Sequence, residues 1–379
     1  MKLLIIQAGF GAGGAEKIVA MIAAHRARLG DEVHVAAMTC PPEGSYFEYP
    51  EGVSLHVLDP PQPRRARLSM LRRTRAIRAL IRTHEPDVVV SFLTKINVQT
   101  LIAALGTYIP VIVSERNNVQ AQAAHPFWRH AQSALMPQAA RIVMQTKRAC
   151  RDVPTRARDN AHVIPNPCAP RAGQSDPPVV NPPRLAAVGR LSHQKGFDLL
   201  LRAMALLHGQ HPDLRLTIYG EGEQRAALEA QRTALGLEHV VDLPGNSTTP
   251  GAWIADTDIL VLSSRYEGFP NVVAEGLVNA RPVVAFDCDF GPQELIEDGV
   301  NGRLVPQGDV MALAEALGAL AAAPRMRAAM AQNATALRVR LDPAIIMAQW
   351  DDVIADAAAT ARHARGHTSV VRSYPQSER

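Results

Sequence analysis

Short apolar runs alternate with longer amphipathic segments along most of the chain. In the first half, runs rich in valine, isoleucine and leucine occupy residues 2–7, 32–38, 87–92, 110–114 and 141–145. Near-continuous apolar runs of about four to eight residues are typical of parallel strands that are buried on both faces. Amphipathic segments between them are typical of the helices that cover such a sheet. We therefore predict an α/β domain with a doubly wound parallel sheet.

The same alternation restarts after a proline-rich stretch between residues 165 and 183, and it predicts a second domain of the same class. Prolines at this density exclude both a helix and a central strand. The second set of apolar runs occupies residues 184–188, 215–219, 240–243, 258–262 and 282–285. The predicted organisation is a first domain over 1–172, a linker over 173–183, a second domain over 184–342, a final helix over 343–362, and a disordered tail over 363–379. Two such domains facing one another leave a cleft at the carboxyl ends of their strands, where open α/β sheets bind ligands.

Composition narrows the class of function. The 40 basic and 36 acidic side chains leave a net charge of +4, which is too small for a general nucleic-acid binder. Aromatic residues make up only 4% of the chain, too few for a platform on which bases stack. The cysteines form no CxxC pair, which excludes a disulfide scaffold and a cysteine-rich zinc site and suits a reducing compartment.

The membrane prediction depends on the length of the apolar runs. The run that begins at Leu3 is interrupted by glycine after a few residues, so it is too short for a signal peptide, which needs about 7–15 apolar residues. No run approaches the roughly 18 residues of a spanning helix. We expect a cytoplasmic protein that touches only the surface of the inner face of the cytoplasmic membrane.

A glycine-rich turn follows the first predicted strand and contains a literal G-x-G-x-x-G between Gly9 and Gly14. A nicotinamide dehydrogenase would carry an acidic residue at the end of the second strand, and here Asp31 lies at its beginning, so that function is disfavoured. A ligand can instead approach the backbone at Gly13 and Gly14, with Glu16 in the first turn of the next helix. The alternative is a tight turn without a ligand.

Two cations lie in the loop after the first strand of the second domain. Arg190 offers a planar fork of donors and Lys195 a compact charge, so together they can hold a diphosphate and neutralise it as it departs. The alternative interpretation is a solvated loop.

Two carboxylates, Glu267 and Glu275, flank a predicted loop-to-helix junction. Glu267 can accept hydrogen bonds from the hydroxyls of a donor sugar, and Glu275 can accept them from both hydroxyls of a ribose. At the junction, free backbone N–H groups favour a phosphate. The candidate positions there are Phe269, Pro270, Asn271 and Val272.

Polar residues also follow two strands of the first domain. They can bind an acceptor sugar or merely cap helices. The candidates are Thr94, Lys95, Asn97, Glu115, Arg116 and Asn117.

Two Asp-x-Asp triplets, at 256–258 and 287–289, could suggest a metal ion. The first precedes a strand, at the end away from the predicted cleft. Near the second, the cations and the helix N-terminus already supply the positive charge that a metal would provide. We therefore expect no catalytic metal and no cofactor.

In their order and spacing, these motifs resemble the retaining glycosyltransferases of family 4, which have the GT-B fold. The resemblance covers most of the chain and rests on Gly13-Gly14-Ala15-Glu16, the Arg190 to Lys195 loop, Glu267-x7-Glu275, and Gly291-Pro292-Gln293-Glu294 with Asp298-Gly299-Val300-Asn301-Gly302. It implies a nucleotide-sugar donor, which we expect to be UDP-linked, with Arg190 and Lys195 on its diphosphate, Glu267 on its sugar and Glu275 on its ribose. It also implies that the last helix, over 343–362, returns to pack on the first domain, which suits the apolar face that carries Trp350.

The segments 91–97 and 114–118 further resemble those of bacterial members that extend a polyprenyl-diphosphate-linked oligosaccharide, including N-acetylgalactosaminyl transferases. This implies a lipid-linked glycan acceptor and a role in surface polysaccharide or glycoprotein glycan assembly. A nucleotide-sugar epimerase of the same fold remains an alternative, as does a non-enzymatic lipid- or glycan-binding protein.

An arginine-rich segment, Arg64–Arg82, contains no acidic residue. On a helix, Ile77 and Ile81 share one face while Arg72, Arg75, Arg78 and Arg82 lie largely on the other. This segment can bind an anionic membrane surface or a lipid-linked diphosphate. The alternative is a helix whose arginines face water.

Overall fold

A computed structural model describes residues 1–58, 66–116, 118, 126–172, 180–247 and 249–371, with only the backbone for 66–69 and 361–371. The chain divides into two compact units. The first comprises Met1–Pro165 together with the chain from Ile346 onward, and the second comprises Asn166–Ile345. Each unit is built on one parallel sheet.

The first unit has a seven-stranded sheet in the order β3-β2-β1-β4-β5-β6-β7, with every pair parallel. The strand order reverses between β1 and β4, which is the point where doubly wound sheets bind ligands. The strands are β1 (Lys2–Gly9), β2 (Glu32–Thr39), β3 (Val53–Val57), β4 (Val88–Phe92), β5 (Val111–Ser114), β6 (Arg141–Met144) and β7 (Ala161–Val163), and the helices are α1 (Gly14–Arg28), α2 (Ala66–His84), α3 (Thr94–Ala104), α4 (Pro126–Leu135) and the long α12 (Pro343–Val371).

The second unit has a six-stranded parallel sheet in the order β10-β9-β8-β11-β12-β13, and its order reverses between β8 and β11. Its strands are β8 (Arg184–Val188), β9 (Arg215–Tyr219), β10 (Val241–Gly245), β11 (Ile259–Leu262), β12 (Val283–Phe286) and β13 (Gly302–Val305), and its helices are α5 (Phe197–His208), α6 (Arg225–Ala234), α7 (Asn271–Val278), α8 (Pro292–Leu295), α9 (Val310–Ala322), α10 (Pro324–Ala334) and α11 (Leu337–Arg340).

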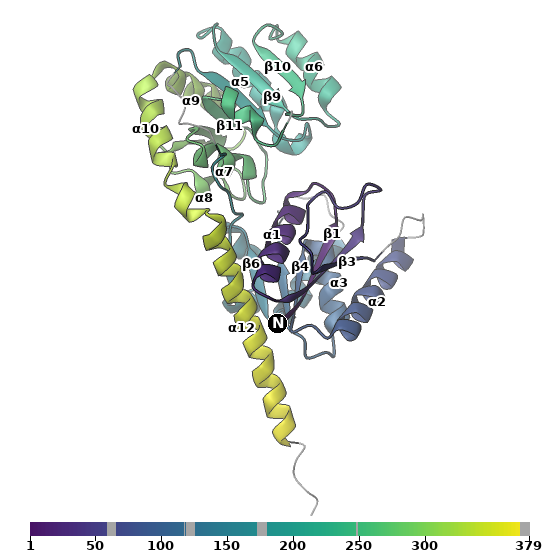
Figure 1. The fold of residues 1–379 in the computed structure, drawn as a ribbon. Helices are drawn as coiled ribbons and strands as arrows, with labels where there is room; N and C mark the ends of the chain where they lie inside the picture. The colour runs from purple at the N-terminus through teal and green to yellow at the C-terminus, as the bar shows by residue number, and fades with distance from the viewer. Residues whose placement is uncertain (59–65, 117, 119–125, 173–179, 248, 372–379) are drawn as a thin grey trace, which may run out of the picture. The chain divides into compact units, whose positions relative to one another are not determined.

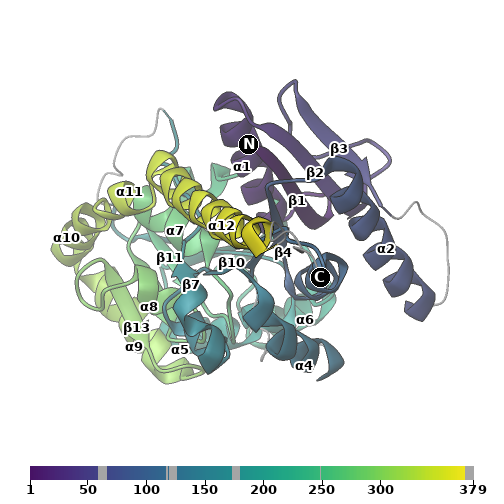
Figure 2. The ribbon, with the colours of Figure 1, turned by 90° about the horizontal axis from the view of Figure 1, so that it is seen from below.

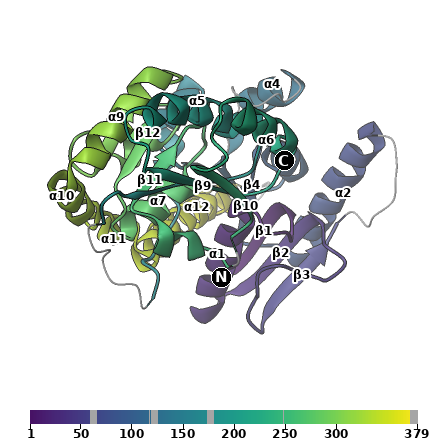
Figure 3. The same cartoon turned by 90° about the horizontal axis from the view of Figure 1, so that it is seen from above.

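Side chains alternate between the two faces of each sheet. In the first unit, Val33 and Val35 face a core shared with α1 and α12, and Figure 2 shows α1 and α2 on opposite sides of β1, β2 and β3. In the second unit, one core packs α5 and α9 on the sheet and another packs α7 on the opposite face (Figure 3). Both sheets are therefore covered on both faces.

Helix α12 carries the chain back to the first unit (Figure 1). Its Trp350 is 1% exposed and packs against Phe92 at the end of β4, with 5.8 Å between ring centroids. Asp351, one residue further on, accepts hydrogen bonds from His25 and Arg26 of α1 at 2.7 Å each. These contacts of two adjacent residues join α12 to α1 and to the sheet.

Every strand expected from an apolar run is present, with ends shifted by at most two residues. The three strands that the pattern did not predict, β3, β7 and β13, all lie at sheet edges. An edge strand pairs on one side only and is partly solvated, so it lacks a continuous apolar run.

Three predicted boundaries differ from the structure. Residues 166–172 belong to the second unit, not the first, because Cys168 N–H donates to the Leu341 carbonyl and Arg171 N–H to the Asn279 side chain. The first unit resumes at Ile346, where α12 starts to contact it. Helix α12 also continues to Val371, so the tail expected from residue 363 is helical that far.

Candidate functional site

The carboxyl edge of the second sheet holds a close ion pair. Lys195 lies in the loop after β8, and Glu267 lies in the loop after β11, on the two strands that flank the reversal of strand order. Lys195 Nζ is 2.7 Å from Glu267 Oε1, and the Ser264 hydroxyl donates to the same oxygen at 2.6 Å. The Glu267 side chain is only 6% exposed and that of Lys195 18%. A charged pair is thus held, largely desolvated, where such sheets bind ligands.

The two loops that carry this pair are joined by several hydrogen bonds. Ser263 Oγ donates to the Lys195 carbonyl at 2.9 Å, and Gln194 Nε2 donates to the Tyr266 carbonyl at 3.0 Å. Arg265 forms a bidentate ion pair with Asp198, with bonds of 2.8 and 2.7 Å. These contacts fix both loops before any ligand binds.

Gly196 is required for this close approach. Its φ is +63°, and a Cβ at this position would lie 2.1 Å from the Ser263 carbonyl oxygen. Any other residue would therefore push the Lys195 loop away from β11.

Cys288, after β12, lies beside the pair and was not predicted from the sequence as part of the site. It is fully buried, and burial together with the charge of Glu267 raises the pKa of its thiol, against the smaller opposing effect of Lys195. The thiol is therefore a neutral, apolar wall of the site rather than a nucleophile.

The start of α7 differs from the prediction. Pro270 has no N–H, and the Asn271 N–H donates to the Phe269 carbonyl at 2.9 Å, so neither backbone can donate to a phosphate. Within the described residues, the N–H groups of Phe269 and Val272 have no backbone partner. The Asn271 side chain accepts from Asn166 at 2.6 Å. Of the four predicted positions, two therefore retain a free backbone donor.

The remaining predicted donor residues lie at the same edge of the sheet. Arg190 is exposed, and no ion pair with another described residue holds its guanidinium. Glu275 is half-buried, one turn into α7.

The first Asp-x-Asp triplet has a structural role, since Asp256 and Asp258 both pair with Arg184. In the second, the Asp289 carbonyl accepts the Glu267 N–H, so this segment supports the site through its backbone.

The carboxyl edge of the first sheet carries a buried polar network. Glu115 accepts hydrogen bonds from Thr94 at 2.8 Å and from Gln132 at 2.6 Å. Asn97, 1% exposed, donates to the Ser114 carbonyl at 3.0 Å. These predicted acceptor residues are therefore engaged in positioning β4, β5 and the helices that follow them.

Arg116 is also buried in this network. Its Nε donates to Ser114 Oγ at 2.9 Å, and its guanidinium lies 5.2 Å from the Phe92 ring and 5.5 Å from the Trp350 ring. Burial lowers its pKa to about 9, and the nearby Glu115 carboxylate opposes that shift. Asn117 lies outside the described residues.

Two of the predicted acceptor residues at the carboxyl edge of the first sheet, Lys95 and Glu16, are not buried in this network. Lys95 is exposed, with Nζ 5.9 Å from the centre of the Trp128 ring. The Glu16 carboxylate folds back onto the glycine turn. It lies so close to Gly13 that a Cβ at that position would be 2.1 Å from Glu16 Oε2. A carboxylate thus lies at the N-terminus of α1, next to Gly14, so acceptor hydroxyls suit this turn better than a phosphate. Burial raises the pKa of Glu16.

Gln7 and Tyr49 were not predicted as part of this site. Gln7 is 1% exposed and donates to the Tyr49 hydroxyl at 3.3 Å, while its Oε1 has no partner among the described residues. Burial raises the pKa of Tyr49, and the charge of Glu16 adds to the shift. The sequence contains one signal that could have identified Gln7 as part of the site, because a glutamine lies inside an otherwise apolar strand.

The arginine-rich helix α2 is only partly as predicted. Ile77 and Ile81 are buried, as expected. Arg78 is not on a free surface, because it donates to the carbonyls of Ala103 and Leu105 at the end of α3, at 2.9 and 2.8 Å. The exposed arginines of the described part are Arg75 and Arg82, and Arg64 and Arg65 lie outside it. Among the described helices, none has both the length and the hydropathy needed to cross a bilayer.

Two family models together match most of the chain. Residues 174–337 match the model described as glycosyl transferases group 1, and residues 13–169 match the glycosyl transferase 4-like domain. The boundary between the matches falls near the boundary between the two structural units. The resemblance to glycosyltransferases that the motifs indicate is thereby confirmed.

Curated relatives and solved structures agree with these models. The chain is 32% identical over 171 residues to the amylovoran biosynthesis glycosyltransferase AmsD of Erwinia amylovora, covering 45% of this chain and 48% of that protein. It is 33% identical over 128 residues to a poly(ribitol-phosphate) alpha-N-acetylglucosaminyltransferase of Staphylococcus aureus, covering 34% of this chain and 26% of that protein. The chain thus matches about half or less of the length of these relatives.

The structure of Anabaena HepE in complex with UDP superposes with a TM-score of 0.78 at 22% identity, covering 94% of this chain and 100% of that one. The lipopolysaccharide outer core galactosyltransferase WaaB superposes with a TM-score of 0.77 at 18% identity, covering 93% and 99%. The predicted fold class, two doubly wound parallel-sheet domains of GT-B type, is confirmed.

Proposed function

Because the chain belongs to the group 1 glycosyltransferases, we propose that it transfers a sugar from a UDP-linked donor to a glycan acceptor in bacterial surface polysaccharide assembly. The observation that carries the proposal is the desolvated Lys195–Glu267 pair at the carboxyl edge of the second sheet. A lysine beside a carboxylate offers one partner for an anionic leaving group and one for sugar hydroxyls, which is the combination that a nucleotide sugar requires.

In the proposed donor site, Lys195 and the exposed Arg190 neutralise the diphosphate, and the free N–H groups of Phe269 and Val272 donate to its oxygens. Glu267 accepts from the sugar hydroxyls, and Glu275 accepts from the ribose. UDP is supported by solved structures of HepE, which shares the fold, because these contain UDP and UDP-glucose.

The proposed chemistry is a substitution at the anomeric carbon with retention of configuration. The bond from that carbon to the diphosphate oxygen breaks, and a bond to the acceptor hydroxyl oxygen forms on the same face of the sugar. The departing diphosphate oxygen takes the hydroxyl proton. The protein contributes preorganised charge that stabilises the leaving group.

We expect transfer to proceed with retention in the presence of excess chelator, because the positive charge at the diphosphate comes from Lys195 and Arg190. The anomeric configuration of the product is read by NMR, and the rate is compared with and without chelator. An inverted product contradicts the mechanism. So does a loss of activity that only a divalent ion restores.

For the acceptor, we propose a polyprenyl-diphosphate-linked glycan, bound at the carboxyl edge of the first sheet. Lys95, which is exposed, and Glu16, which is half-buried, are the groups available to its sugar there. An N-acetylhexosamine is our proposed donor sugar, since one relative is named as an N-acetylglucosaminyltransferase.

The deciding experiment incubates the full chain with a panel of UDP-sugars, with and without a polyprenyl-diphosphate-linked acceptor, and identifies the products by mass spectrometry. A glycosylated acceptor supports the proposal. A changed UDP-sugar released without acceptor instead identifies a nucleotide-sugar epimerase, and binding without any product identifies a non-enzymatic binding protein.

We further propose that the exposed arginines of α2 bind the anionic inner face of the cytoplasmic membrane. Reversing Arg75 and Arg82 to glutamate changes the charge by four units without touching the buried face. Binding to vesicles that contain anionic lipid is expected to weaken, since each basic residue near such a surface contributes about 1 kcal/mol. Binding of the parent should weaken as salt is raised.

The matched control reverses Arg151 and Arg156, two exposed arginines of the same unit, to glutamate. It should bind vesicles much as the parent does. Equal loss in both variants indicates that net charge alone governs binding. Equal retention in both indicates that the arginines of α2 simply face water.

A further inference from the structure

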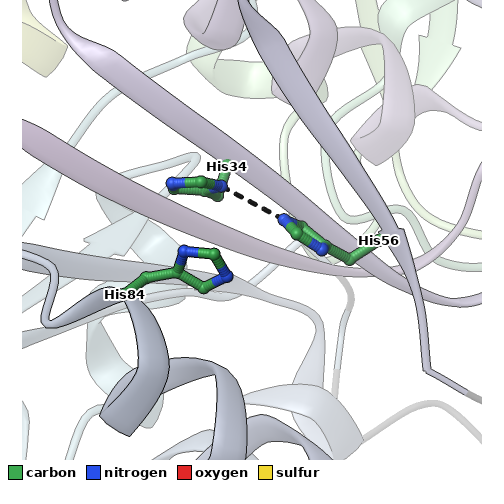
Figure 4. A group of neighbouring side chains, drawn as sticks. All are labelled: His34, His56 and His84. Carbon is green, nitrogen blue, oxygen red and sulfur yellow. Dashed lines mark hydrogen bonds between the residues drawn. The ribbon is translucent and has the colours of Figure 1, made fainter.

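Three histidines that are far apart in the sequence meet at the edge of the first sheet. His34 lies on β2, His56 on the edge strand β3, and His84 is the last residue of α2. Val33 and Val35 face the core shared with α1 and α12, so strand alternation directs His34 to the opposite face, on which α2 lies. Figure 4 shows the three rings turned toward one another.

The rings have the spacing of a ligand set. His34 Nδ1 is 3.1 Å from His56 Nε2, and one nitrogen of each of the three rings lies within 4.8 Å of the others. With Zn–N bonds of about 2.0–2.1 Å, two nitrogens of a tetrahedral site are about 3.3 Å apart. His34 and His56 are already close to this distance, and a nitrogen of His84 lies within 4.8 Å of one nitrogen of each.

A carboxylate orients the most buried of these rings. His34 is 5% exposed, and its Nε2 lies 3.0 Å from Glu32 Oε1. An Nε2–H that donates to Glu32 leaves the lone pair of Nδ1 directed toward His56. A carboxylate on the far nitrogen of a histidine ligand is a recurrent feature of metal sites, because it fixes the tautomer and makes the ligand more basic.

The charges around the cluster also permit a cation. Lys2 is the opposing group, but its ammonium lies 3.6 Å from Glu32, which offsets its charge.

We propose that His34, His56 and His84 form a binding site for one divalent transition-metal ion such as Zn²⁺, with water as the fourth ligand. Three imidazoles are a ligand set suited to zinc, copper and nickel. The ion would join β2, the edge strand β3 and the end of α2. His34 lies five residues before the end of β2, about 16 Å from the carboxyl edge of the sheet. The site is therefore separate from the proposed sugar transfer.

The test uses the full chain freed of metal with EDTA and then titrated with Zn²⁺ in a calorimeter. We expect one ion per chain, an increase in the melting temperature, and, with Co²⁺, the visible absorption bands of a nitrogen-rich tetrahedral site. Glu32→Gln should weaken zinc binding about 10–100-fold, because it removes only the orienting carboxylate. His56→Gln and His84→Gln each remove a ligand and should weaken it more.

The matched control is His239→Gln in the second unit, where His239 Nε2 lies 3.3 Å from His208 Nε2. This variant removes a histidine from a close pair outside the cluster, so it should bind Zn²⁺ like the parent. Melting curves in EDTA show whether each variant is folded, and the Co²⁺ spectrum of the parent tests the site without any substitution. Equal zinc affinity of the parent and both ligand variants, or no Co²⁺ bands in the parent, overturns the proposal.

Discussion

Replacing Lys195 with alanine is expected to reduce kcat for sugar transfer by about 10²–10³-fold, the usual effect of removing one group that stabilises charge developing in the transition state. Lys195 Nζ is the one described cation bonded to the buried Glu267. The affinity for UDP should fall as well, because the diphosphate loses a positive partner. Calorimetry with UDP and initial rates of transfer measure the two effects separately.

The same change leaves the Glu267 carboxylate buried without its counter-charge, which destabilises the second unit. Breaking a fully buried pair costs about 3–5 kcal/mol, and the partial exposure of Lys195 makes the cost here smaller. The double variant Lys195→Ala, Glu267→Gln removes the uncompensated charge, so it should recover stability but not activity. Recovery of both would mean that Lys195 acts only through folding.

Two further variants define where the donor binds. Glu275→Ala should weaken UDP binding through loss of the ribose contact. Lys147→Ala, which removes an exposed lysine of the first unit, should change neither binding nor transfer. If Lys195→Ala and Glu275→Ala both bound UDP like the parent, the donor site proposed around β8 and α7 would be wrong.

Replacing Trp350 with alanine is expected to destabilise the first unit by about 3–5 kcal/mol, the usual cost of truncating a buried aromatic side chain. Trp350 is 1% exposed and packs on Phe92 and on the Arg116 guanidinium, so its loss opens a cavity between α12 and the sheet. Chemical denaturation followed by circular dichroism measures the change. Binding of UDP below the unfolding transition should be retained, because the proposed donor residues belong to the second unit.

Trp350→Phe is the matched control. The indole Nε1 is buried and has no hydrogen-bond partner among the described residues, so phenylalanine removes an unsatisfied donor and keeps most of the ring contact. We expect a much smaller loss of stability than for alanine. Equal losses in the two variants would show that ring packing does not hold α12 to this unit.

The sequence by itself determined the fold class, because buried parallel strands leave near-continuous apolar runs whose order can be read directly. It also located the main elements of the candidate donor site. Lys195 and Glu267 each follow a predicted strand, and the carboxyl ends of parallel strands share one edge, so their proximity follows from topology. The return of the last helix was implied by the family resemblance, and the apolar face that carries Trp350 is consistent with it.

Only the tertiary structure decided which polar residues are available to a ligand and which support the fold. Asn97 follows β4, as Lys95 does, and Glu115 and Arg116 follow the neighbouring strand β5, so their sequence context does not separate them from Lys95. Burial does, because a desolvated polar group must find partners within the protein, and theirs lie on neighbouring elements. In the same way, the sequence does not distinguish Arg78 from Arg75. In the structure, Arg78 donates to carbonyls at the end of α3, and Arg75 is exposed.

The histidine cluster also could not be predicted from the sequence. His34, His56 and His84 are separated by 22 and 28 residues, so no local spacing marks them as ligands. They meet because the pairing of β3 with β2 fixes one register and the packing of α2 fixes the position of its last residue. Local pattern determines which elements form and which face of each is apolar, but contacts between distant elements depend on register and packing, which exist only in the folded chain.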